Sequence, residues 1–209
     1  MKTEEFKLTK NGARATIDGV KVFFSKETLY RFGIDSNKEY TPKEFAEIYS
    51  FNEKLLAKDY LLTLLSRYRK SQADASRKLK SKGYSAVAIA EAIKFAKEYG
   101  YLDDALFAED YVKETQGRKG AYKIKHDLLQ KGIKKELVEE ALAEINDEAQ
   151  LAAACKICTK IAKGEQKGYK LKQKMYSRLM QSGFASSIIS RALKGYDLYE
   201  YGDTPEYDN

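Results

Sequence analysis

One short segment occurs three times in this chain of 209 residues, as KLKSKGY at 78–84, DLLQKGI at 127–133 and RLMQSGF at 178–184. In each copy a leucine lies four residues before a glycine, and a large apolar residue follows the glycine directly. Aliphatic or alanine residues also align in all three copies at the sixth, ninth and tenth positions after the glycine. This agreement at corresponding positions predicts three tandem structural repeats.

Each copy contains three helical patterns. The first helices carry apolar residues three and four positions apart, as in Leu61, Leu64, Leu65 and Tyr68 of the first copy, which is typical of an amphipathic helix. The repeated glycine is suited to a left-handed residue that ends the second helix, so that the next apolar side chain folds back onto the core. A bundle of three short helices buries little apolar surface alone, so we expect neighbouring units to stack into a curved rod.

The N-terminal segment has a different period. Apolar residues alternate with polar ones over residues 5–24, which is typical of half-buried strands. The runs are interrupted by Asn11-Gly12 and Asp18-Gly19, dipeptides that tolerate the positive φ of a type I′ turn, so a three-stranded meander is expected. Ser25 and Thr41 have residue types that cap helices, and each is expected to start one.

These patterns together predict a mainly α fold. We expect an elongated array of three tandem three-helix repeats, with a small N-terminal β-hairpin or meander element. The expected parts of the chain are 1–54 for the N-terminal β-meander plus short helices, 55–104, 105–146 and 147–196 for the three helical repeats, and 197–209 for an acidic flexible tail.

Composition restricts the chemistry. The chain has one histidine and no tryptophan, which nearly excludes a histidine-based triad or a multi-histidine metal site. No apolar run reaches the roughly 18 residues of a membrane-spanning helix, and the first residues do not have the pattern of a secretory signal. Two cysteines without an export signal indicate a cytoplasmic protein. We therefore expect a protein that is not an enzyme, needs no cofactor and has no membrane partner.

Two motifs have both a chemical and a structural interpretation. Cys155 and Cys158 form a CxxC, but a zinc site needs four ligands, no second pair exists, and His126 lies in another repeat. Both cysteines fall on the apolar stripe of a helix, so packing is the favoured role. His126 itself is expected at the surface or half-buried, in a structural role.

Two glycine-rich segments and an acidic pair also have both a chemical and a structural interpretation. The segments 117–120 and 164–168 lack the order of a phosphate-binding loop and are interpreted as mobile links between the first and second helices. Asp103-Asp104 precedes an expected helix, where a carboxylate satisfies free backbone N–H groups, so capping is favoured over a metal pair.

Charge is segregated along the chain, whose formal net charge is +7. Residues 60–104 carry +4 and 147–196 carry +7, whereas 105–146 are neutral and 197–209 carry −5. Basic residues recur before and along the second helix of each repeat, where they would form a stripe suited to an anionic polymer. An ordinary solvated helix face is the alternative. The residues of this predicted basic stripe are Arg67, Arg69, Lys70, Arg77, Lys78, Lys80, Lys82, Arg118, Lys119, Lys123, Lys125, Lys163, Lys167, Lys170, Lys172 and Lys174.

The repeats, together with GYLDDALFA at 100–108, resemble the RecX family of bacterial regulators of the RecA recombinase. The resemblance covers residues 55–196, and the hairpin before them resembles an extension that some members carry. It implies an all-helical array that lies in the groove of the RecA filament, restrains its recombinase and coprotease activities, and binds DNA. The third copy departs from the family pattern at Ser182, where lysine or arginine is usual. The resemblance implies no role for the acidic tail.

Two functions remain open. The resemblance implies a monomeric, non-catalytic modulator, an inhibitor, of RecA filaments, with the basic stripe touching single- or double-stranded DNA independently of sequence, or acidic filament surface. The alternative is a helical DNA-binding protein that acts as a transcription or nucleoid factor independently of RecA, because helix, glycine turn and helix resemble a helix-turn-helix. Against it, residues 86–99 offer chiefly alanine, glutamate and lysine, whereas base edges are read by arginine, asparagine and glutamine.

Overall fold

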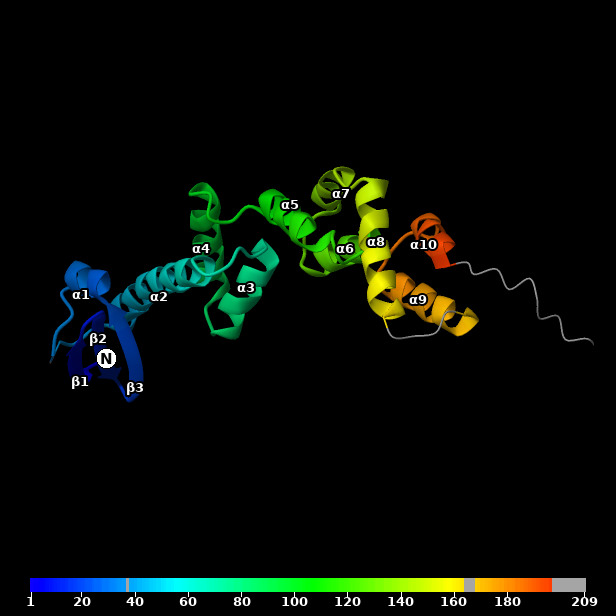
Figure 1. Cartoon of the computed structure of the whole chain (residues 1–209). Helices are drawn as coiled ribbons and strands as arrows, with labels where there is room; N and C mark the ends of the chain where they lie inside the picture. Colours follow the sequence, from blue (N-terminus) through cyan, green and yellow to red (C-terminus); the bar gives the residue numbers. More distant parts are fainter. Residues whose placement is uncertain (37, 164–167, 197–209) are drawn as a thin grey trace, which may run out of the picture. The chain divides into compact units, whose positions relative to one another are not determined.

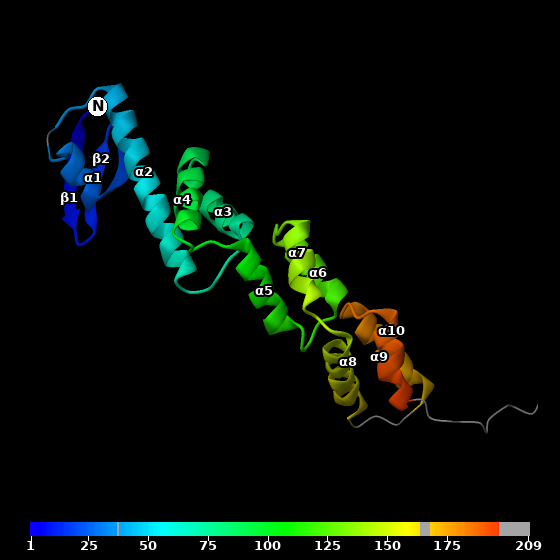
Figure 2. The ribbon, with the colours of Figure 1, turned by 90° about the horizontal axis from the view of Figure 1, so that it is seen from above.

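The structure, a computed structural model, describes residues 1–36, 38–163 and 168–196. It is mainly α-helical with a small antiparallel sheet at the N-terminus, as the sequence predicted (Figures 1 and 2). The chain divides into two compact units, Met1–Asp103 and Asp104–Asn209. The first unit holds the sheet and the first repeat, and the second unit holds the other two repeats. Within the described ranges, none of the helices has the length and apolar character that crossing a membrane requires.

The sheet is a meander in the order β1-β2-β3, with β1 Thr3–Thr9, β2 Gly12–Ile17 and β3 Val20–Ser25 paired antiparallel. The second turn is as predicted, because Asp18 and Gly19 both have positive φ, 45° and 77°. The prediction for the first turn is wrong. Gly12 is the first residue of β2 and pairs with Thr9 of β1, so it lies in the sheet and not in the turn. A Cβ on Gly12 would collide with the carbonyl oxygen of Phe24. Glycine is needed at that position for close approach within the sheet rather than for the turn.

Two helices cover one face of the sheet. Helix α1, Lys26–Phe32, and helix α2, Pro42–Leu65, enclose a core that contains Ile17 and Phe24. Both predicted caps are confirmed. The Ser25 side chain accepts from the Thr28 N–H, and Thr41 forms a capping box with Glu44.

The first repeat shares a helix with the N-terminal element. Helix α2 continues without a break across positions 54 and 55, where the sequence suggested a boundary, and then packs with α3, Gln72–Ser81, and α4, Ala86–Glu98. Tyr68, which was expected on the first helix, lies beyond its end and is exposed. The division points of the chain stay predictions.

The second and third repeats each consist of three helices. Alanine, leucine and isoleucine side chains from all three helices of a repeat form its core. The helices are α5 Asp104–Thr115, α6 Ala121–Gln130 and α7 Lys135–Ala143, followed by α8 Asp147–Ala162, α9 Tyr169–Gln181 and α10 Ser186–Leu193, with a 3-10 turn η1 at Lys194–Tyr196.

The repeated glycine ends the second helix of every repeat, as predicted. The φ angles are 88° at Gly83 and 78° at both Gly132 and Gly183, values that residues other than glycine rarely adopt. The residue after each glycine donates its N–H to the carbonyl of the leucine four residues before the glycine, at 3.1 to 3.4 Å. This is the hydrogen bond of a Schellman motif, and it turns the following apolar side chain toward the core.

The link between α5 and α6 is held in place, which contradicts the expectation of a mobile segment. Gly120 is buried and donates its N–H to the Ser182 carbonyl at 2.8 Å, while Tyr122 donates to the Gly183 carbonyl at 3.1 Å. A Cβ on Gly120 would collide with the Gly183 backbone. The second and third repeats therefore contact each other backbone to backbone. Most of the other glycine-rich link, 164–167, lies outside the described residues.

The cysteines pack in the core of the third repeat, as the sequence favoured. Cys158 is fully buried among apolar side chains, Cys155 is half-buried, and both thiols are free. Burial raises the pKa of the Cys158 thiol to about 11, so the thiol stays protonated at neutral pH. No group of metal-ligating side chains large enough to hold an ion occurs in the described part of the chain.

Candidate partner-binding surface

In the first repeat the predicted basic stripe lies on the link after α2 and on α3. Arg67, Arg69 and Lys70 are on the link, and Arg77, Lys78 and Lys80 project from α3. Most of these side chains are exposed. Helix α3 is amphipathic, because Ala75 and Leu79 are buried in the core, and the basic side chains of this helix are directed toward solvent.

Several of these cations have no partner in the protein. Among the residues that the structure describes, the side chains of Arg67, Lys70, Lys78 and Lys80 form no ion pair, hydrogen bond or ring contact. Arg77, by contrast, pairs with Asp74 one turn earlier on α3. The positive charges of the four unpaired residues are therefore available to an external anion.

In the second repeat one carboxylate, that of Asp127, pairs with two of the predicted cations. Lys119 Nζ lies 2.6 Å from Asp127 Oδ2, Lys123 Nζ lies 3.0 Å from Oδ1, and the Tyr111 hydroxyl donates to Oδ2 at 3.0 Å. The Asp127 side chain is 12% exposed and that of Lys119 is 30% exposed, so this cluster is partly withdrawn from water. Lys125 is also engaged, at 3.4 Å from Glu139.

The contacts between Asp127 and Lys119 shift the pKa values of both groups. Partial burial alone would raise the pKa of Asp127, but hydrogen bonds from Lys119, Lys123 and Tyr111 outweigh it and lower that pKa to about 2. Partial burial would likewise lower the pKa of Lys119, yet its hydrogen bonds to Asp127 and Tyr111 raise it. Both groups are therefore charged throughout the physiological pH range and stabilise each other.

Comparison with known proteins decides the family. The family model for the second three-helix domain of RecX matches residues 103–142, and that for the third matches 147–193. A regulatory protein RecX from Clostridium botulinum strain Alaska E43 is 30% identical over 207 residues, which cover 97% of this chain and 98% of the relative. One from Caldanaerobacter subterraneus is 31% identical, over 85% of this chain and 89% of its own length.

The chain belongs to the RecX family of regulatory proteins.

Solved RecX structures have the same fold. A crystal structure of regulatory protein RecX superimposes with a TM-score of 0.67 at 24% identity, over 92% of this chain and 98% of the other. RecX from Lactobacillus salivarius gives a TM-score of 0.61 at 24% identity, over 70% of this chain and 98% of the other.

The third repeat of this RecX chain carries exposed lysines. Lys163 is the C-cap residue of α8, while Lys170 and Lys174 project from α9 into solvent, and Lys172 is half-buried. Lys163 and Lys170 contact none of the described side chains through an ion pair or a hydrogen bond. The predicted Lys167 lies outside the described residues.

Three exposed tyrosines accompany the basic residues, and the sequence patterns did not mark them as a binding feature. Tyr68, Tyr122 and Tyr169 are 76%, 67% and 80% exposed. Each lies in the link before the second helix of its repeat or in the first turn of that helix, with Lys or Arg within one residue. The sequence signal was available, because each aromatic residue lies next to cations at a similar place in its repeat, but periodicity alone assigns aromatics to cores.

Proposed function

We propose that this chain is a non-catalytic modulator, specifically an inhibitor, of RecA recombinase filaments. In this proposal the protein binds in the filament groove and contacts DNA or acidic filament surface through its basic residues. The observation that carries the proposal is membership of the RecX family over 97% of the chain. The partner comes from the family resemblance, and the surface chemistry of this chain supports a polyanionic ligand.

The exposed side chains fit a nucleic-acid strand. Cations without internal partners, such as Lys78 and Lys80, can each neutralise a phosphate and release a counterion. Tyr68, which is exposed between Arg67 and Arg69 in the sequence, offers a ring on which an unpaired base can stack, and stacking requires no particular base identity. Contact with DNA is therefore expected to depend on salt and to be indifferent to sequence.

The decisive experiment is the ATPase rate of RecA on single-stranded DNA, measured with increasing amounts of this protein. We expect the rate to fall as the protein is added. Lys78→Gln/Lys80→Gln should weaken this inhibition severalfold. Lys156→Gln/Lys160→Gln, which removes two exposed lysines from α8 outside the predicted basic stripe, is the matched control. An ATPase rate that stays constant at saturating protein contradicts the proposal.

The alternative, a DNA-binding regulator independent of RecA, finds less support in the third helices. Helix α4 contains no arginine, asparagine or glutamine, the side chains that most often make bidentate contacts with base edges. On α10, Arg191 is held by Glu148, with 2.7 Å between Nη2 and Oε1. Tight binding to one duplex that survives high salt, with no effect on RecA, would favour this alternative.

A further inference from the structure

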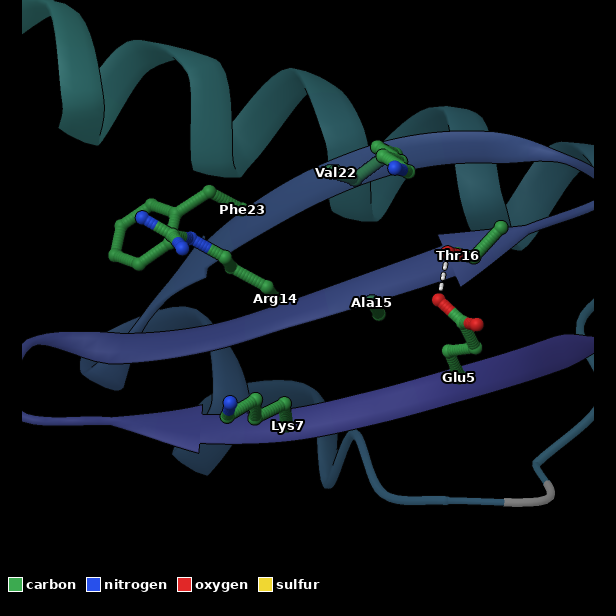
Figure 3. Close-up of a pocket in the computed structure, with 8 residues that line it drawn as sticks. Glu5, Lys7, Arg14, Ala15, Thr16, Val22 and Phe23 are labelled. Atoms are coloured by element: carbon green, nitrogen blue, oxygen red, sulfur yellow. Dashed lines mark hydrogen bonds between the residues drawn. The ribbon is translucent and has the colours of Figure 1, made fainter.

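The outer face of the N-terminal sheet carries cations and an aromatic ring that no helix covers. Figure 3 shows these side chains projecting from the strands, with a helix behind the sheet. Helices α1 and α2 both pack against the opposite face, where they bury Ile17 and Phe24. The strand register places two rows of side chains on the outer face: Lys7, Arg14 and Phe23, and then Glu5, Thr16 and Lys21.

These six residues, which we call the β-face, line an open hollow of about 510 Å³. That volume lies within the range of sites for small organic molecules, so it can accommodate one nucleotide. The strand that carries Phe23 is firmly held. The Asn52 side-chain amide donates to the Phe23 carbonyl at 2.8 Å and accepts from the Ser25 N–H at 2.9 Å. Asn52 thus satisfies two backbone groups at the outer edge of β3, which disfavours pairing with a peptide strand at that point.

The β-face is positively charged and its cations have no internal partners. Lys7, Arg14 and Lys21 are exposed, and none of them pairs with an acidic residue within the described ranges. The one carboxylate of the face, on Glu5, accepts a hydrogen bond from the Thr16 hydroxyl at 3.1 Å, as the dashed line in Figure 3 marks. With three cationic side chains and one carboxylate, the β-face carries a net positive charge that attracts anions. Arg14, at its centre, can bind a phosphate through two parallel hydrogen bonds.

We propose that the β-face binds single-stranded nucleic acid. Arg14, Lys7 and Lys21 would contact phosphates, and a base would stack on the ring of Phe23. An unpaired strand is favoured over a duplex, because the bases of a duplex are stacked on each other and cannot offer a free face to Phe23. An acidic peptide would satisfy the cations but would leave the aromatic ring without a matching surface. The β-face lies outside the three-helix repeats, and this inference does not depend on RecA.

The test is a salt series of the full chain with a fluorescein-labelled oligothymidylate, followed by fluorescence anisotropy without RecA. Arg14→Gln should weaken binding severalfold at low salt and reduce the slope of log affinity against log salt by about one. The matched control is Lys26→Gln, which removes an exposed cation from α1, on the covered side of the sheet. It should change affinity less than about twofold, since it removes no phosphate contact. Equal effects of the two variants would overturn the proposal.

Stacking is tested separately at Phe23. Phe23→Ala should weaken binding of the oligothymidylate by roughly fivefold or more and leave binding of a duplex of equal length unchanged. Phe23 is half-buried, so Phe23→Ala could also affect folding. A second measurement therefore uses the wild-type chain: a strand containing iodouracil is photo-crosslinked to it, and the crosslinked residue is identified by mass spectrometry. Crosslinks at Phe23 support the proposal. Crosslinks confined to the helical repeats, or oligoglutamate that competes as well as the oligothymidylate, would overturn it.

Discussion

Replacing Gly183 with alanine should separate the second and third repeats, in addition to straining one turn. Gly183 has a φ of 78°, and a residue with a Cβ pays about 1 to 2 kcal/mol for that conformation. Gly83 occupies the same place in the first repeat with a φ of 88°, and an added Cβ there meets nothing within 4 Å. Gly83→Ala therefore measures the conformational strain alone.

At Gly183 the same methyl group meets backbone. It would collide with the amide nitrogen of Lys123 in the first turn of α6, so the start of that helix must move away. Such a movement breaks the hydrogen bonds from Gly120 to Ser182, at 2.8 Å, and from Tyr122 to Gly183, at 3.1 Å. Each contributes about 1 kcal/mol. Gly183→Ala should then cost about 3 to 4 kcal/mol, against about 1 to 2 kcal/mol for Gly83→Ala.

The assay is urea unfolding of both variants by circular dichroism, together with hydrogen exchange of the Tyr122 amide. Exchange reports on the interface directly, because that amide is bonded across the two repeats. We expect it to be protected in the wild type and in Gly83→Ala, and to exchange quickly in Gly183→Ala. Equal losses of stability in the two variants, with Tyr122 still protected, would refute the reasoning.

Three further predictions follow from the charges and the exposed rings. In the folded protein the pKa of Asp127 lies below its ordinary value of 3.8. The Asp127 carboxylate therefore contributes about 2 kcal/mol to the free energy of unfolding above pH 4, and this contribution is lost as the pH falls toward 2. Urea unfolding should accordingly separate wild type from Asp127→Asn at pH 7, with the gap closing between pH 4 and pH 2. Tyr68→Ala should weaken single-stranded DNA binding by roughly fivefold in fluorescence anisotropy, whereas Tyr30→Ala, which removes an exposed ring from α1, should not. Deleting residues 197–209 removes five carboxylates and should tighten DNA binding at low salt, with a gain that shrinks as salt is added.

The repeats and their helix ends could be predicted because local chemistry specifies them. A leucine, a glycine and a following apolar residue encode a helix end at short range, and the structure confirms it in every copy. The tight link at Gly120 could not be predicted. Its glycine is required by the backbone of Gly183, sixty-three residues later in the chain, and nothing in the local sequence reveals that approach.

The sequence could indicate which helices carry the basic residues, but it could not indicate all of their ion pairs. The pairing of Lys123 with Asp127 follows from their spacing on one helix. The stronger contact, from Lys119, crosses from the preceding link, and its geometry depends on how that link folds. Alternation in the sheet likewise identified which residues share a face, whereas which face the helices cover was decided by packing. Even on the covered face burial is incomplete: Leu8 and Val20 pair directly with the buried Ala13 and Ile17, yet they are exposed.

One position explains why equivalent lysines have different roles in different repeats. The residue before the repeated leucine is Lys78 in the first copy and Arg178 in the third, but Asp127 in the second. The Asp127 carboxylate binds Lys119 and Lys123 and makes them part of the support of the second repeat. A cation at that position offers no partner to Lys70 and Lys170, the equivalents of Lys119, and adds to the outward charge. The ion pairs of Lys119 and Lys123 are then a structural property of the second repeat. Under the proposed function, we expect the cations of the first and third repeats to contribute most to the binding of a polyanion.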